Sequence, residues 1–153
     1  MKHAAPQQRF NLRGKRIAIV YARFYPELAD QLLEGAKSAL HECGAAAKHI
    51  TTYEVSGCFE LPIAAARAIA RGRFDAVIAL GAVIRGQTAH FNYIAGECAR
   101  GLMDVQLQTG RPIGFGVLTT DTYEQAAERA DPKRGNKGHA AAMAAASVLQ
   151  IHA

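Results

Sequence analysis

The sequence predicts a single doubly wound α/β domain, in which a four-stranded parallel sheet carries helices on both faces. Short apolar runs alternate with longer helical patterns in the order β-α-β-α-β-α-β-α-α. The first and third of these runs are almost continuously apolar, as expected of parallel strands that are covered on both faces. The chain has 153 residues, of which 50% are hydrophobic, and this is enough for one core.

Short connections and right-handed crossovers join the predicted elements into one sheet. The strands are marked by apolar and β-branched residues, and the helices by apolar residues spaced three and four apart. In chain order, the elements are strand 16–22, helix 26–44, strand 47–55, helix 61–70, strand 74–80, helix 88–108, strand 112–118, helix 121–130 and helix 137–149.

Prolines and glycines set the boundaries in the first half of the chain. Pro26 stands where the first helix begins, and Gly44 is a suitable C-terminal glycine for it. Pro62 is tolerated in the first turn of the second helix, where its missing N–H costs nothing, and Gly72 closes that helix.

Glycine and capping patterns set the boundaries in the second half. A glycine-bounded turn at residues 81–86 links the third strand to a helix that begins near Thr88 and ends at Gly110. The next helix is expected to start with a capping box, in which Asp121 satisfies the early amides and Glu124 reaches back.

The first residues of the chain are polar and basic. They predict a flexible N-terminal arm over residues 1–15, followed by one domain over residues 16–153. No stretch resembles a signal peptide or a membrane span. The three cysteines are far apart and lack a C-x-x-C pair, which predicts reduced thiols. We therefore expect a cytoplasmic protein with no membrane partner.

The net charge of +5 suits an anionic metabolite. Nucleic acid is not expected, because no aromatic and basic ladder or recognition-helix pattern accompanies the charge. Residues 81–86 have the glycine spacing of a phosphate loop but lack the Lys-Ser/Thr that must follow it. The sequence also lacks G-x-G-x-x-G, G-x-S-x-G and a metal-spaced His/Asp/Glu set, so neither a metal nor a dinucleotide cofactor is expected.

Polar, aromatic and glycine residues follow every predicted strand. The carboxyl ends of parallel strands meet at one edge of a sheet, and open α/β sheets bind their ligands there. We therefore expect these stretches to gather into one site. They are residues 23–25, 56–60, 85–90 and 119–120.

Four side chains at this edge suggest chemistry on a small phosphorylated molecule. The helix start beside Thr88 offers unpaired N–H groups to a phosphate, and His90 in the first turn can move protons near neutral pH. Phe24 can stack on a flat ring, and Glu60 can accept hydrogen bonds from hydroxyl groups.

Each of these residues also has a plainer explanation. His90 fits a partly buried first-turn histidine, Phe24 fits a core residue, and Glu60 fits a carboxylate favoured by a helix dipole. Cys58 is most simply a small residue in a tight loop, with no acid or base beside it in sequence. The cations near the last helix fit a solvated surface: Lys133, Arg134 and Lys137. The residues alone leave these alternatives open.

Six motifs stand in a fixed order and spacing from about residue 16 to the end of the chain. They are A-R-F at 22–24, G-C-F-E-L-P at 57–62, L-G-A-V-I-R-G-Q-T-A-H-F at 80–91, F-G-V-L-T-T at 115–120, E-Q-A-A-E-R-A at 124–130 and G-N-K-G at 135–138. This set resembles the 6,7-dimethyl-8-ribityllumazine synthase family of riboflavin biosynthesis, and it is much more specific than any one of its motifs.

The resemblance implies a flavodoxin-like three-layer sandwich and a cofactor-independent transferase. The implied reaction condenses 5-amino-6-(D-ribitylamino)uracil with 3,4-dihydroxy-2-butanone 4-phosphate and releases phosphate and water. His90 is implied to move protons during imine formation and elimination, and Phe24 to stack on the pyrimidine. The other implied contacts are Ser56, Gly57, the Cys58 backbone, Glu60, Val83 and Ile84 for the ring and ribityl chain, and Gln87, Thr88 and Arg129 for the phosphate.

The resemblance also implies an assembly of identical subunits. Phe115 is expected to come from a neighbouring subunit, so that the site is shared, and Lys137 is expected near it. Family members form pentamers, and some build a sixty-subunit shell. The short connector 131–134 is associated with shells, whereas Pro132 departs from the usual pattern. Riboflavin synthase is a candidate protein partner.

Three positions depart from the family pattern. Ser56 replaces a usual proline, Tyr25 stands where asparagine is usual, and Ala82 replaces a residue that is often polar or cysteine. These changes motivate an alternative, a catalytically weak paralogue that binds a lumazine or flavin or acts as an assembly scaffold. The presence of His90 and Arg129 favours the enzyme. A flavodoxin-like regulatory or nucleotide-binding domain would explain the fold but not the turn before His90.

Overall fold

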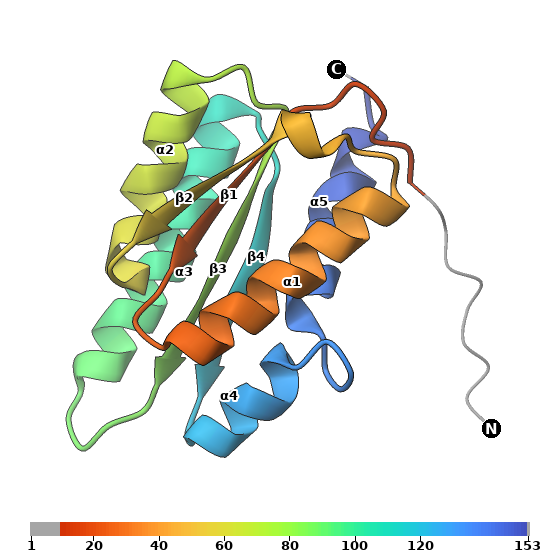
Figure 1. Cartoon of the computed structure of the whole chain (residues 1–153). Helices are drawn as coiled ribbons and strands as arrows, with labels where there is room; N and C mark the ends of the chain where they lie inside the picture. The colour runs from red at the N-terminus through yellow and green to blue at the C-terminus, as the bar shows by residue number, and fades with distance from the viewer. Residues whose placement is uncertain (1–9, 153) are drawn as a thin grey trace.

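The computed structural model describes residues 10–152 of the chain. Four parallel strands form one sheet in the order β2-β1-β3-β4, with α1, α4 and α5 on one face and α2 and α3 on the other (Figure 1). This arrangement confirms the predicted doubly wound α/β class and the order of its elements. The elements are β1 Ile17–Ala22, α1 Pro26–Glu42, β2 Ile50–Val55, α2 Leu61–Arg71, β3 Ala76–Ile84, α3 His90–Thr109, β4 Ile113–Thr120, α4 Tyr123–Ala130 and α5 Lys137–Leu149.

The central strands are buried on both faces, which explains their almost continuous apolar sequence. Along β1, Ile17 and Ile19 point into the core under α1 and α5, whereas Ala18 and Val20 point into the core under α2. The same alternation runs along β3. At roughly 25 cal/mol per Å² of buried apolar surface, these two cores supply most of the driving force for folding.

The third strand is longer than the sequence predicted. Gly81, expected to begin a turn, lies inside β3 and pairs with Val117 of β4. A Cβ on Gly81 would lie 2.6 Å from Cys58 Sγ and 3.1 Å from Ala22 Cβ, so the glycine permits close packing against these neighbours. The turn therefore follows Ile84, and α3 begins at His90 rather than near Thr88.

The capping box of α4 uses different residues from those expected. Thr122 is the N-cap, and its hydroxyl accepts a 3.1 Å hydrogen bond from the Gln125 N–H. Gln125 Oε1 accepts in return from the Asp121 and Thr122 N–H groups. The prediction of Asp121 and Glu124 was wrong by one position, because the Asp121 carboxylate pairs with Arg85 instead, at 2.9 Å.

Two further segments differ from expectation in detail. Residues 47–49, predicted as the start of a strand, form a 3₁₀ turn before β2. Residues 1–9 of the expected flexible arm lie outside the described residues, whereas two side chains of residues 10–15, Phe10 and Leu12, pack against the core. Leu12 is fully buried, and its N–H donates to the Cys43 carbonyl at 2.8 Å. This apolar side chain ties the segment to the end of α1.

None of the helices within residues 10–152 combines the length and the apolar character that a membrane-spanning helix needs.

Candidate active site

Two cavities lie at the carboxyl end of the sheet, and they divide most of the predicted site residues between them. We call them the His90 cavity, of about 520 Å³, and the Arg129 cavity, of about 510 Å³. The His90 cavity is lined by Phe24, Tyr25, Ser56, Gly57, Cys58, Phe59, Glu60, Ala82, Val83, Ile84, His90 and Ile94. The Arg129 cavity is lined by Arg85, Phe91, Ala95, Gly96, Ala99, Phe115, Thr119, Thr120, Asp121, Gln125 and Arg129.

The segments that follow β1, β2 and β3 build the His90 cavity. Phe24, directly after β1, is 69% exposed, which excludes the alternative that it fills the core. His90 is exposed at the first residue of α3, so it is not the partly buried histidine of the plainer explanation. Val83 and Ile84 bring the half-buried end of β3 to the same cavity.

The loop after β2 places a carboxylate and backbone groups in this cavity. Glu60 precedes α2, but its side chain makes no capping hydrogen bond to that helix. A Cβ on Gly57 would lie 3.1 Å from Glu60 Oε2, so the glycine leaves room for the carboxylate. Ser56 is exposed at the entry to this loop.

Cys58 is a neutral thiol beneath the cavity rather than a nucleophile. The side chain is buried, and burial, with a smaller contribution from Cys98, raises the pKa of the Cys58 thiol to about 12. A thiol with this pKa is almost wholly protonated near neutral pH. The neutral thiol agrees with the interpretation of Cys58 as a small residue in a tight loop.

Gln87 and Thr88 lie in the exposed turn before α3, beside His90 but outside the set that lines the cavity. The N-cap residue Ala89 has no side chain that can cap the helix, although the Thr88 hydroxyl accepts a 3.4 Å hydrogen bond from the His90 N–H. The start of α3 thus keeps the partial positive charge of early helical N–H groups close to an exposed histidine.

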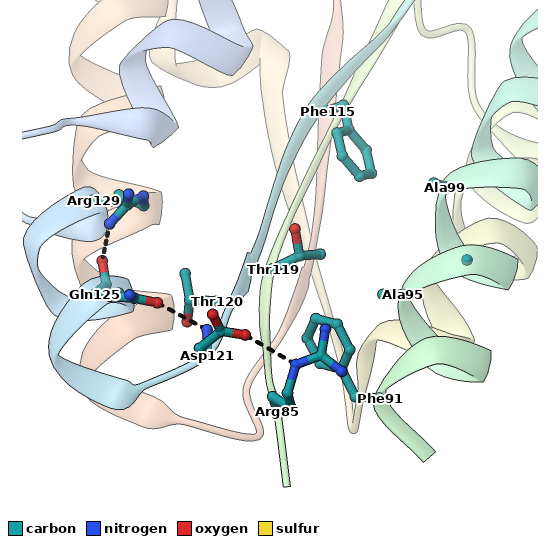
Figure 2. A pocket seen from close by; sticks show the side chains of 11 residues that line it. Arg85, Phe91, Ala95, Ala99, Phe115, Thr119, Thr120, Asp121, Gln125 and Arg129 are labelled. Carbon is teal, nitrogen blue, oxygen red and sulfur yellow. Dashed lines mark hydrogen bonds and ion pairs between the residues drawn. The ribbon is translucent and has the colours of Figure 1, made fainter. Parts of the chain in front are cut away.

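The Arg129 cavity spans the outer side of β4, between α3 and α4 (Figure 2). Arg129 extends from α4 and donates to the Gln125 carbonyl at 3.0 Å. Phe115 lies on β4 and is 48% exposed. In Figure 2, Ala95 and Ala99 of α3 face these two residues from the opposite wall.

Arg85 closes the lower end of the Arg129 cavity as Figure 2 draws it. Its Nε donates to Asp121 Oδ1 at 2.9 Å, and its guanidinium carbon lies 4.4 Å from the centroid of the Phe91 ring. The two contacts join the turn after β3 to the loop after β4. Arg85 is therefore neutralised and stacked, whereas no carboxylate within residues 10–152 forms an ion pair with Arg129.

The structure does not bring all the predicted phosphate contacts together within one chain. Arg129 shares a cavity with Phe115, separate from the cavity of His90. Lys137 is exposed at the first residue of α5 and lines neither cavity. The reason is topological, since β4 is the edge strand and α4 follows it, so that the Arg129 cavity opens at the edge of the sheet.

Sequence reasoning did not single out Arg85 as a lining residue and treated Tyr25 only as a departure. Both lie in stretches that directly follow strands, which was the available signal. Arg85 pairs with Asp121 and Tyr25 contacts Tyr123, and both of these partners are distant in sequence.

An open parallel α/β sheet with this strand order defines a flavodoxin-like fold, and folds of this class bind ligands at the carboxyl end of the sheet, where the two cavities lie. Comparison with known proteins is more specific. Residues 14–153 match the family model described as 6,7-dimethyl-8-ribityllumazine synthase. The chain is also 49% identical over 139 residues to 6,7-dimethyl-8-ribityllumazine synthase of Syntrophus aciditrophicus (strain SB), a match that covers 91% of this chain and 90% of the relative. The chain therefore belongs to the 6,7-dimethyl-8-ribityllumazine synthase family, and the predicted resemblance is confirmed.

Proposed function

We propose that this chain condenses 5-amino-6-(D-ribitylamino)uracil with 3,4-dihydroxy-2-butanone 4-phosphate at a site completed by two copies of the chain. Membership of the family makes the protein a transferase of riboflavin biosynthesis. The observation that carries the shared site is the division of the predicted contacts between two cavities on opposite sides of the β3 end. The His90 cavity of one copy would face the Arg129 cavity of the next.

The His90 cavity suits a flat ring that bears a polyhydroxylated chain. Its volume of about 520 Å³ falls in the range of small-molecule sites. The exposed face of Phe24 would stack on the pyrimidine, and the backbone of Val83 and Ile84 would hydrogen-bond the ring edge. Ser56, Gly57, the Cys58 backbone and the Glu60 carboxylate would hold the ribityl hydroxyls.

The phosphate would lie at the start of α3. Gln87 and Thr88 flank this helix end, whose early N–H groups favour an anion. Arg129 of the neighbouring copy would add a guanidinium, which can bind phosphate through two parallel hydrogen bonds. Lys137 lines neither cavity, so it would contribute only long-range positive charge.

His90 would serve as the acid and base. Imine formation requires a proton to leave the attacking amine and another to reach the departing water, and phosphate elimination requires a base at carbon. A histidine is suited to both directions of transfer near neutral pH. Its exposure beside the helix end places the imidazole next to the proposed phosphate position.

Phe115 of the neighbouring copy would close the ring-binding side. As a half-exposed aromatic residue on an edge strand, it is available to a second subunit. Several other large apolar side chains are exposed on or near α2 and α3, which supports an oligomeric assembly. They are Phe59, Ile63, Tyr93, Met103 and Leu107.

We propose a homopentamer as the basic assembly. The connector 131–136 accommodates Pro132 in a tight turn, in which the Arg134 and Asn136 N–H groups both donate to the Asp131 carbonyl at 3.0 Å. Light scattering of the purified protein distinguishes a pentamer from a sixty-subunit shell by mass.

A cytoplasmic location and an association with riboflavin synthase complete the proposal, and co-purification tests the association.

The direct test is an absorbance assay for lumazine formation from the two purified substrates. The proposal predicts product well above the uncatalysed background, without added metal or cofactor. If the folded and assembled protein does not exceed that background, the enzyme proposal fails. A binding or scaffold role then takes its place.

A further inference from the structure

Three aromatic rings form a row that ends at the His90 cavity. Phe24 and Tyr25 meet edge to face, with centroids 5.0 Å apart and an interplanar angle of 71°. Tyr25 in turn meets Tyr123 edge to face, at 6.0 Å and 65°. Both pairs have a favourable geometry for aromatic rings, whose positive edges contact the negative faces of their neighbours.

The far end of the row is fixed to two helices. Tyr123 is the first residue of α4, and its hydroxyl donates to Glu27 Oε2 of α1 at 3.3 Å. Partial burial, followed by the Glu27 carboxylate, raises the pKa of Tyr123, so the phenol remains a donor. Tyr25 is half-buried and also packs against the core beneath α1. Figure 1 shows α4 beside the N-terminal part of α1, where this contact forms.

Phe24, at the end of the row that lies in the His90 cavity, has few contacts of its own to fix its ring. Phe24 lies in the short segment between β1 and α1, and 69% of its surface is exposed. An exposed ring samples several rotamers, and stacking on a ligand selects one of them at an entropic cost. A fixed neighbour lowers that cost, because the ring is already oriented before the ligand arrives.

We propose that Tyr25 and Tyr123 are positioning residues that hold Phe24 in the orientation in which its face meets the pyrimidine substrate. The inference rests on the proposed function for the role of Phe24 and adds two residues to which that proposal gives no task. Tyr25 lines the His90 cavity, whereas Tyr123 does not, so the role of Tyr123 toward Phe24 runs through its contact with Tyr25.

The expected effect is on binding of the pyrimidine rather than on chemistry. An edge-to-face pair contributes on the order of 2- to 10-fold to an equilibrium constant. The Tyr25→Ala variant should therefore raise the KM for the ribitylaminouracil about 3- to 10-fold, with kcat and the KM for the butanone phosphate within about twofold. Tyr123→Ala should cause a smaller rise in the same constant.

Conservative and control variants separate positioning from general damage. Tyr25→Phe keeps the ring and should restore the KM for the pyrimidine. Tyr123→Phe keeps the ring but removes the hydrogen bond to Glu27, so it should restore most of that KM. Tyr53→Ala removes another edge-to-face pair, with Phe74 at 6.2 Å, away from the His90 cavity. This control should lose thermal stability comparable to that of Tyr25→Ala without a change in either KM.

Equilibrium binding of the lumazine product, followed by fluorescence, gives a readout that is independent of turnover. The inference predicts weaker product binding for Tyr25→Ala and Tyr123→Ala, wild-type binding for Tyr25→Phe, and binding close to wild type for Tyr123→Phe. It is overturned if Tyr123→Ala binds as tightly as wild type, or if Tyr25→Phe is as weak as Tyr25→Ala, since the hydroxyl would then contact the ligand directly. Failure of the wild type to form product contradicts the proposed function instead.

Discussion

The His90 cavity and the Arg129 cavity are similar in size but differ in chemistry. The first combines an exposed aromatic ring and strand-end backbone with one carboxylate, Glu60, and one imidazole, His90. The second contains two guanidinium groups, one of which is neutralised by Asp121. The first suits a ring and hydroxyl groups, and the second suits an anion.

Under the proposed function, these two cavities of a single chain are complementary halves of a site. A condensation between a pyrimidine and a phosphorylated ketone needs ring stacking, a proton shuttle and an anion contact within a few ångströms of one another. Phe115 on the edge strand β4 and Arg129 on α4 are both open to solvent, where a second copy can approach. The proposal therefore assigns to assembly the meeting of the His90 cavity of one copy with the Arg129 cavity of another.

Removal of the proposed proton shuttle in the His90 cavity should cause the largest loss of activity. General acid and base catalysis is typically worth ~10²–10⁴-fold, so His90→Ala should lower kcat by a factor in this range. Because Phe24 and Glu60 remain in place, binding of the lumazine product should change little. A His90→Ala variant with wild-type kcat would remove the imidazole from the mechanism.

Removal of the anion contact should affect the other substrate. Hydrogen bonds to charged groups contribute about 1.5–3 kcal/mol, so Arg129→Ala should raise the KM for the butanone phosphate by roughly 10- to 100-fold. The KM for the ribitylaminouracil should stay close to that of the wild type. Equal losses for both substrates in steady-state kinetics would show that Arg129 acts through structure rather than through phosphate.

A methyl group added at Gly81, beneath the His90 cavity, should lower the stability of the fold, whereas one added in the Arg129 cavity should not. Gly81→Ala places a Cβ against Cys58 Sγ and Ala22 Cβ, and overpacking of this kind costs about 1–3 kcal/mol of unfolding free energy. As a matched control, Gly96 of α3 faces open space in the Arg129 cavity, so Gly96→Ala should leave stability unchanged or slightly higher. Urea unfolding compares the two, and equal stability would contradict the packing explanation of Gly81.

Alkaline pH should lower the stability of the folded chain through the buried thiols Cys58 and Cys98. Burial raises the pKa of Cys58 to about 12 and that of Cys98 to about 11, whereas thiols in the unfolded chain ionise near 8.5. Stability is therefore fully present below the unfolded pKa and is lost as pH rises toward the folded values. Urea midpoints should fall between about pH 8 and about pH 11, and a Cys58→Ala/Cys98→Ala variant should flatten this dependence. An unchanged slope in that variant would assign the loss to other groups.

Much of the fold could be predicted because local signals and global packing agree. The apolar runs of β1 and β3 and the prolines at the starts of α1 and α2 identified their elements. Errors arose where two patterns compete locally. Gly81 has the composition of a turn, but Cys58 packs over it and keeps it in the strand. Asp121 and Thr122 both fit an N-cap, and the choice depends on Arg85, which is distant in sequence.

The candidate site was predictable for residues that follow strands and not for residues on a helix surface. Phe24, Glu60 and His90 could be placed at the sheet edge from topology alone. Arg129 is an exposed residue on α4, and only the resemblance to the family gave it a role. Its place beside Phe115, away from His90, required the three-dimensional arrangement of β4 and α4.

The most direct test of a site shared by two copies is complementation between two impaired variants, assayed at a butanone phosphate concentration far below the KM of Arg129→Ala. His90→Ala and Arg129→Ala chains are co-assembled in equal amounts, and lumazine formation is compared with that of each variant alone. If neighbouring copies supply the two halves, random mixing gives intact sites at about a quarter of the positions and restores activity in that proportion. If one copy supplies both halves, no mixed site is intact. Activity no higher than the average of the two variants would then contradict the shared site.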